Sequence, residues 1–130
     1  MRYRARSFFE SFRFALAGLV FMWRTQRNFR VHVIAGTTAL SLALLLDCTR
    51  VEIAILALVS SGVMAFEMVN TAIENAVDLA THRKHPLAKA AKDVAAGAVL
   101  LSALTALGAG ALILGPRAWS SWVLIALGQP

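Results

Sequence analysis

Three long apolar stretches follow one another along the chain. The first, residues 31–46, ends at Asp47. The second keeps a helical pattern over residues 51–81, and the third, residues 94–114, is followed by Gly115 and Pro116. About 20 residues of helix cross a hydrocarbon core of about 30 Å. The pattern therefore predicts an all-α membrane protein whose three transmembrane helices cover about residues 29–47, 51–81 and 86–114.

A shorter amphipathic segment precedes these stretches, at about residues 6–25. Its apolar side chains share about one third of a helical wheel and have arginines around them. This pattern is typical of a helix that lies in the cytoplasmic interface of a membrane. Phe14 and Phe21 fall outside the apolar face, which leaves burial against other helices open. The face consists of Phe8, Phe9, Phe12, Leu16, Leu19, Val20 and Trp23.

The chain is expected to form one membrane domain over residues 1–115, followed by a C-terminal tail over residues 116–130. The apolar part of the tail, residues 118–127, is too short to span a membrane. Trp119 and Trp122 are expected to anchor the tail at the membrane interface, where tryptophan is enriched.

Composition and charge together indicate whether this basic chain binds nucleic acid or lies in a membrane. Hydrophobic residues make up 58% of the 130 residues, and 13 Lys and Arg against 7 Asp and Glu give a net charge of +6. Such a charge suits nucleic acid or an anionic membrane surface. Because a soluble domain of this size cannot bury so many apolar residues, we expect a membrane protein that binds no nucleic acid.

The distribution of the cations predicts the orientation in the membrane. Seven of the 13 Lys and Arg lie at or before Arg30, and four lie between Arg83 and Lys92. Cytoplasmic segments carry the excess of Lys and Arg, so the N-terminus and the second loop are expected to be cytoplasmic and the C-terminus outside. Residues 24–30 are rich in arginine where a cleavage site would lie, so we expect the N-terminal segment to be retained.

An aligned row of polar side chains in the second stretch is the strongest chemical signal. Glu67, Asn70, Glu74 and Asp78 fall within one narrow stripe of a helix. Carboxylates are unfavourable at bilayer depth, so this row predicts a functional site. The first two are expected at the inner edge of the hydrocarbon and the last two in the cytosol, an arrangement that suits chemistry joining a lipid headgroup to a soluble cofactor. Hydrogen bonds and ion pairs between helices are the alternative explanation.

The second loop and the start of the third helix add cations beside these carboxylates. In an antiparallel pair of helices, Lys92 and Asp93 lie about level with the acidic row. Since Mg²⁺ prefers oxygen ligands and phosphates need positive donors, the group indicates a nucleotide–Mg²⁺ site. A loop that is basic only because it is cytoplasmic is the alternative. The group consists of His82, Arg83, Lys84, His85, Lys89, Lys92 and Asp93.

Several other kinds of site are not supported by the sequence. The chain has no glycine-rich phosphate-binding loop and no nucleophile elbow, so a bound nucleotide would be held by side chains on membrane helices. A zinc site on His82 and His85 lacks further ligands, and the single Cys48 excludes a disulfide within the chain. Small residues along 95–110 allow close helix packing, and three short helices hardly enclose a site alone, so we expect an oligomer.

The same residues carry a resemblance to a known family. The pattern E-x-x-N-x-A-I-E-x-x-x-D that begins at Glu67, followed by Ala-Lys-Asp at residues 91–93, resembles the signature of the prokaryotic diacylglycerol kinase/undecaprenol kinase family. Residues 11–19 and the Arg-Asn-Phe-Arg-Val-His of residues 27–32 are similar to the undecaprenol kinase side of that family. The resemblance covers about residues 7–112.

The resemblance implies a lipid kinase of the bacterial inner membrane that uses ATP and Mg²⁺ and forms a homotrimer with active sites shared between subunits. It gives Glu67 the role of proton acceptor for the lipid hydroxyl, with Asn70 beside it in the active site. It makes Glu74 a ligand of Mg²⁺–ATP. Lys92 and Asp93 match nucleotide-site positions, and the loop that carries Arg83, Lys84 and His85 is expected near the ATP.

One position departs from the family pattern. Where the family often has a metal-binding glutamate just before Arg-Asn-Phe, this chain has Gln26. Glutamine offers a neutral carbonyl to Mg²⁺ and brings no charge. From the resemblance as a whole we expect ATP-dependent phosphorylation of undecaprenol or diacylglycerol. A non-catalytic membrane scaffold and a small cation or proton conductor remain the alternatives.

Overall fold

The computed structural model describes residues 7–81 and 83–127, except for the side chains of residues 121–125. Within these residues the chain is helical throughout, with no strand: α1 spans Phe8–Thr25, α2 Arg27–Leu45, α3 Arg50–Ala80 and α4 Pro86–Ala126. The predicted all-α fold, with an N-terminal amphipathic helix and three long apolar helices, is confirmed. Residue His82 and the side chain of Trp122, both singled out in the sequence, lie outside this description.

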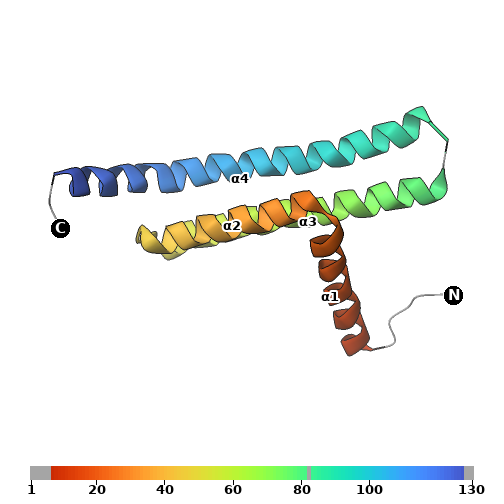
Figure 1. Ribbon diagram of the computed structural model, residues 1–130, viewed down its shortest axis with the longest axis horizontal. Coiled ribbons are helices and arrows are strands. Elements are labelled where there is room, and N and C mark those ends of the chain that lie inside the picture. Colours follow the sequence, from red (N-terminus) through yellow and green to blue (C-terminus); the bar gives the residue numbers. More distant parts are fainter. Residues whose placement is uncertain (1–6, 82, 128–130) are drawn as a thin grey trace.

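Helices α2, α3 and α4 run alongside one another, whereas α1 turns away from them (Figure 1). Three helices are long and apolar enough to cross a membrane: α2, α3 and residues 86–120 of α4. The chain is therefore a membrane protein. The two ends of this bundle are named below after their connections. The loop end carries the α3–α4 connection, residues 81–85, and the turn end carries the α2–α3 connection, residues 46–49.

The packed core of the bundle is small. The buried apolar residues are Met22, Phe29, Ala43, Leu56, Val63 and Ala95, and most of the large apolar side chains on the helices are exposed. Helices α2 and α3 are in close contact at Gly36, where an added Cβ would lie 3.1 Å from the Cβ of Ser60. An exposed apolar exterior over three helices is what lipid or a neighbouring subunit covers in a membrane protein.

Helix α1 shows its apolar face to the surroundings. Phe8 and Phe9 are each 82% exposed, and Phe14 and Phe21 are exposed as well, so they are not buried against other helices. Arg30 links α1 to α2, because its Nη1 donates to the carbonyl of Trp23 at 2.9 Å and thereby satisfies the C-terminal end of α1. The amphipathic helix is thus held at one end and free along its apolar face.

Helix α4 differs from the expected third span at its C-terminal end. The span was predicted to end at residue 114, before Gly115 and Pro116, but α4 continues through Pro116 to Ala126. Proline removes one backbone donor and disfavours a helix interior, although membrane helices tolerate it. Arg117, the next residue, is anchored by hydrogen bonds to the turn end, and this anchoring stabilises the helical continuation.

Candidate functional site

The acidic row lies on the face of α3 that the other helices cover. Glu67 is 4% exposed and Asn70 is 9% exposed, and the neighbouring Thr71 is buried too. Glu74, two turns after Glu67, is half-buried, and Asp78 is exposed. The row therefore runs from a buried end to an exposed end along one helix, as the spacing in the sequence predicts. Burying a carboxylate in a membrane helix costs free energy, so its presence indicates a functional site.

Asn70 and Glu74 form a fixed pair within this row. The side-chain Nδ2 of Asn70 donates to Oε1 of Glu74 at 3.0 Å. The other end of the amide, Oδ1 of Asn70, is the single buried side-chain polar atom among the described residues that has no hydrogen-bond partner. Because a buried acceptor without a partner is unfavourable, this oxygen indicates a missing donor or cation.

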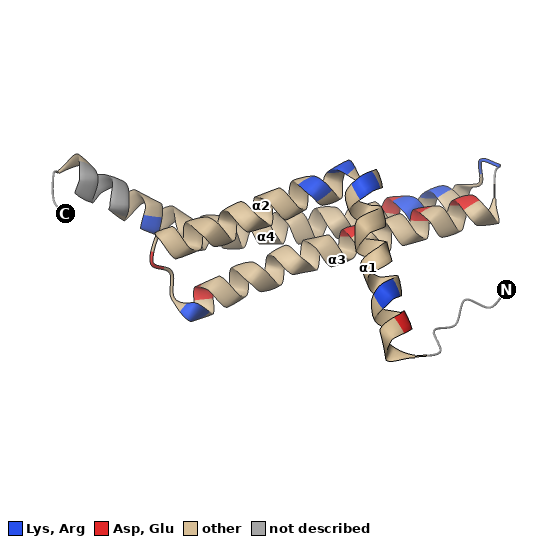
Figure 2. Ribbon diagram, turned by 60° about the horizontal axis from the view of Figure 1, so that its bottom comes forward, with Lys and Arg blue, Asp and Glu red and all other residues tan. Residues whose placement is uncertain are grey.

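Two ion pairs follow the row toward the loop end. Lys92 on α4 donates to Oδ1 of Asp78 on α3 at 2.6 Å, which brings the two helices into the antiparallel register that the sequence predicts. Lys89 pairs with Asp93 one turn away on α4 itself. Asp93 is thus engaged within its own helix, not across to the acidic row. Figure 2 shows these charges gathered on α3 and α4 toward the loop, with a mostly uncharged stretch between them and the turn end.

An open cleft of about 810 Å³ lies at the loop end, between the last turn of α3 and the first turns of α4. Four cationic side chains line it against two carboxylates, so its charge is positive. The cationic residues are Arg83, Lys84, Lys89 and Lys92, and the acidic ones are Asp78 and Asp93. The lining begins at Val77, directly after the Asn70–Glu74 pair, so the cleft continues the row without including its buried part.

The N-terminus of α4 opens onto this cleft. Pro86 is the first residue of the helix, and Nδ1 of His85 accepts a hydrogen bond from the backbone N–H of Leu87 at 3.2 Å. His85 therefore caps the helix, as Ser or Asp caps other helices, and in its neutral form carries its proton on Nε2. A helix N-terminus with cations around it is a favourable site for phosphate groups.

Gln26, the position that departs from the family pattern, lies between two helices. Gln26 lies at the junction of α1 and α2, where it caps both helices, and its Nε2 donates to Thr25. The contacts seen in the structure thus join Gln26 to its neighbour rather than to Glu74. The described residues also hold no group of three His, Cys, Asp or Glu that could bind a metal ion. A cation on Glu74 would need further oxygen ligands from outside this set.

Two contributors to the site were not predicted from the sequence. His32 on α2 lies within electrostatic range of Glu67, and Thr71 is buried beside Asn70. The signal for His32 is its spacing, since it lies one turn before Gly36, where α2 and α3 approach closely. Thr71 gave no signal, because a threonine in a membrane helix is unremarkable.

The chain is similar to several known proteins. The family model for prokaryotic diacylglycerol kinase matches residues 13–114. A diacylglycerol kinase of Synechocystis sp. is 48% identical over 107 residues, which make up 82% of this chain and 61% of that relative, so the match spans less than two thirds of its length.

Two further relatives extend the comparison. An undecaprenol kinase of Bacillus subtilis is 44% identical over 110 residues, or 85% of this chain and 89% of the relative. A diacylglycerol kinase of Pseudomonas aeruginosa is 35% identical over 94 residues, or 71% of this chain and 76% of that protein. The matched segment of residues 13–114 contains the whole acidic row and the cationic cleft.

Proposed function

Since the chain belongs to the prokaryotic diacylglycerol kinase family and its enzyme class is lipid kinase, we propose that it transfers the γ-phosphoryl group of ATP to the hydroxyl of a membrane lipid. The acceptor is diacylglycerol or undecaprenol, the two lipids in the names of its relatives. One observation carries this proposal: a carboxylate row on α3 runs from the buried Glu67 to Asp78, which lines an open cationic cleft. A lipid alcohol reaches the buried end of the carboxylate row, and a soluble nucleotide reaches the cationic cleft.

The lipid half of the site is formed by Glu67 and Asn70. Glu67 accepts the proton of the lipid hydroxyl as the oxygen attacks the γ-phosphorus, and its burial keeps water from competing with the lipid. General-base assistance of this kind contributes about 10²- to 10⁴-fold to a rate. Asn70 orients Glu74 through its amide N–H.

The nucleotide half begins at Glu74. Its carboxylate and the free carbonyl oxygen of Asn70 are the oxygen ligands that Mg²⁺ prefers, so the residues present fit this ion. Mg²⁺ bound there supplies charge neutralisation for the phosphates. The remaining ligands come from the phosphates, from water and from other protein groups, because the described residues hold no group of three His, Cys, Asp or Glu side chains that could bind a metal ion. Gln26 offers its Oε1 as a neutral ligand, since its contact with Thr25 is made by Nε2.

The cleft holds the phosphates and the rest of the nucleotide. Lys92 releases Asp78 and contacts the transferred group, while Arg83 and Lys84 neutralise the phosphate charges. Charge stabilisation by such donors is the main contribution that a protein makes to phosphoryl transfer. His85 and the N-terminus of α4 donate to the same phosphates, and Asp93 keeps Lys89 in place on the rim.

The enzyme works at the cytoplasmic face of the bacterial inner membrane as a homotrimer. The excess of Lys and Arg in the N-terminal segment and at the loop end supports a cytoplasmic N-terminus and loop, with the C-terminus outside. The exposed apolar helix faces and the open cleft support sites that neighbouring subunits complete. Crosslinking in native membranes that returned only monomers would contradict the trimer.

A substrate comparison tests the activity. Purified protein in mixed micelles is given Mg²⁺ and ATP labelled at the γ-phosphate, with undecaprenol and diacylglycerol in parallel reactions. We expect label in at least one of the two lipids and none when Mg²⁺ is chelated. Label in neither lipid, from protein whose far-ultraviolet circular dichroism is that of folded helices, would contradict the proposed function.

A further inference from the structure

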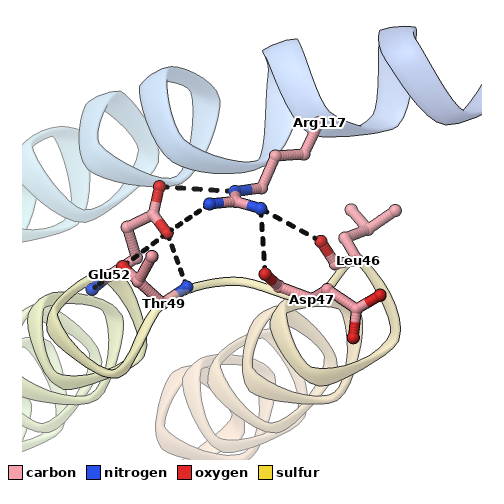
Figure 3. Close-up of polar contacts among 5 residues, drawn as sticks. All are labelled: Leu46, Asp47, Thr49, Glu52 and Arg117. Carbon is pink, nitrogen blue, oxygen red and sulfur yellow. Dashed lines mark hydrogen bonds and ion pairs between the residues drawn. The ribbon is translucent and has the colours of Figure 1, made fainter.

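Arg117 joins three helices at the turn end. Its Nη2 and Nε donate to the two carboxylate oxygens of Glu52 at 2.7 and 3.3 Å, and its Nη1 donates to the carbonyls of Asp47 at 2.9 Å and Leu46 at 3.3 Å (Figure 3). One guanidinium from α4 thus binds the end of α2, the turn and the start of α3. The planar fork of arginine suits this two-sided arrangement, which lysine cannot reproduce.

The partners of Arg117 are held in place before it binds. The backbone N–H and the hydroxyl of Thr49 each donate to Oε2 of Glu52 at 2.7 Å, within a capping box that starts α3. Asp47 has a φ of 50°, and the N–H of Cys48 donates to the carbonyl of Ala43, as in a helix end closed by a left-handed residue. The carbonyl of Asp47 is therefore fixed in its direction, and Arg117 binds a rigid set of acceptors.

Helices α3 and α4 have the most extensive contact of any helix pair described, but the fully buried apolar side chains of α4 provide little to fix the axial register. Ala95 is the one buried apolar residue of α4 among those described, and it is small. A Cβ added at Gly97, Gly108 or Gly110 would meet nothing within 4 Å, so these glycines do not hold α4 in a notch of α3. Because lipid is as apolar as the helix surface, hydrophobic contact does not penalise sliding in a membrane as it does in water.

Two ion pairs therefore define the register, one at each end of the α3–α4 pair. Glu52 and Asp78 are 26 residues apart on α3 (78 − 52), and Arg117 and Lys92 are 25 residues apart on α4 (117 − 92). At 1.5 Å per residue these spacings are about 39 and 38 Å, so the two pairs close together only in one register. A shift of one helical turn, about 5.4 Å, would separate both pairs.

The geometry points to Arg117 as a positioning residue for the nucleotide half of the site. By binding Glu52 and the two carbonyls at the turn end, Arg117 sets the axial register in which Lys92 of α4 lies opposite Asp78 at the loop end. The inference rests on the proposed function, because the site it serves is the proposed nucleotide cleft. Arg117 lies beyond residue 114, where the match to the family model ends, so this anchor is not part of the family's common segment.

The test compares nucleotide affinity in Arg117→Gln with that in the unchanged protein, by calorimetric titration of Mg²⁺–ATP in micelles. Loss of the register weakens Mg²⁺–ATP binding about threefold to tenfold, within the range of coupling measured between distant sites, while kcat at saturating ATP changes less. Arg50→Gln is the matched control, because it removes an exposed cation at the same end of α3 and leaves the affinity unchanged. Arg117→Lys, which keeps one donor toward Glu52, gives an intermediate affinity and serves if Arg117→Gln does not fold.

A double variant separates positioning from general destabilisation. If Arg117 acts through Lys92, then Arg117→Gln has no further effect on affinity once Lys92→Met is present. Unchanged affinity in folded Arg117→Gln, or an equal factor in both backgrounds, would overturn the inference. The proposed function is judged separately, because lipid phosphorylation by the unchanged protein does not depend on the outcome for Arg117.

Discussion

Asn70 and Glu74, one helical turn apart on α3, are joined by a hydrogen bond of 3.0 Å from Nδ2 to Oε1. This bond turns the carbonyl oxygen of Asn70 into a buried acceptor that has no partner among the described residues. The pair connects the buried Glu67 with the cationic cleft, so it lies where the lipid and nucleotide halves of the proposed site meet. The following predictions test that arrangement.

Asn70→Leu removes both the donor to Glu74 and the free carbonyl at similar volume. We expect kcat to fall about 10- to 100-fold, the effect of losing a hydrogen bond to a charged group worth about 1.5–3 kcal/mol. The Mg²⁺ concentration needed for half-maximal activity rises as well, because Glu74 is no longer oriented. Ser61→Ala is the control, since that hydroxyl bonds to its own helix. Equal activity and Mg²⁺ dependence in the two variants would show that Asn70 has no such role.

Lys92→Met and Asp78→Asn separate a phosphate-binding lysine from a structural ion pair. If Lys92 binds phosphate, its loss raises the KM for ATP about tenfold or more, whereas Asp78→Asn leaves the lysine available and has a small effect. Lys89→Met provides a control for the loss of one positive charge on the same helix, where the exposed pair with Asp93 is worth less than about 1 kcal/mol. Equal increases in KM for Lys92→Met and Asp78→Asn would favour a purely structural pair.

At the turn end we expect substitutions of Asp47 and Thr49 to have different effects on the free energy of unfolding. Asp47→Gly is neutral or stabilising, because glycine adopts the positive φ of this residue without strain and Arg117 binds the backbone carbonyl rather than the carboxylate. Thr49→Ala removes the cap of α3 and lowers the free energy of unfolding by about 0.5–2 kcal/mol. Unfolding in micelles, followed by circular dichroism, measures both. A destabilising Asp47→Gly would mean that the carboxylate takes part.

The close contact between Gly36 on α2 and Ser60 on α3 leads us to predict that a larger side chain at Gly36 destabilises the protein. Gly36→Leu forces the side chain against Ser60, where even a Cβ would be only 3.1 Å from the Cβ of Ser60, and overpacking of this kind lowers the free energy of unfolding by about 1–3 kcal/mol. Gly62→Leu is the matched control, because a Cβ there meets nothing within 4 Å of the same chain. The prediction fails if the two variants unfold alike in the same micelles.

The sequence predicted those parts of the fold that depend on local patterns. Apolar stretches of sufficient length predicted the three long helices. The spacing of Glu67, Asn70 and Glu74 predicted that these side chains share one face of α3. The antiparallel arrangement placed Lys92 about level with the acidic row, but its pairing with Asp78 is seen only in the structure.

What the sequence did not predict depends on contacts between distant residues. The continuation of α4 past Pro116 is one example, because a proline after a glycine is a helix-end signal, whereas in the structure the helix continues and Arg117 bonds to residues about 70 positions away. The pairing of Arg117 with Glu52 is another, since the two lie 65 residues apart. The Thr-x-x-Glu spacing of residues 49–52 is a capping-box pattern, which indicates where α3 begins but not that Arg117 reaches it.

The most direct test of the proposed mechanism is phosphoryl transfer by the unchanged protein and by Glu67→Gln, with Mg²⁺–ATP affinity measured on the same samples. The proposal places Glu67 on the lipid side of the site and not on the nucleotide side. Glu67→Gln should therefore bind Mg²⁺–ATP as the unchanged protein does but label the lipid at least about 100-fold more slowly. Undiminished labelling by Glu67→Gln, or no labelling of lipid by the unchanged protein, would contradict the account.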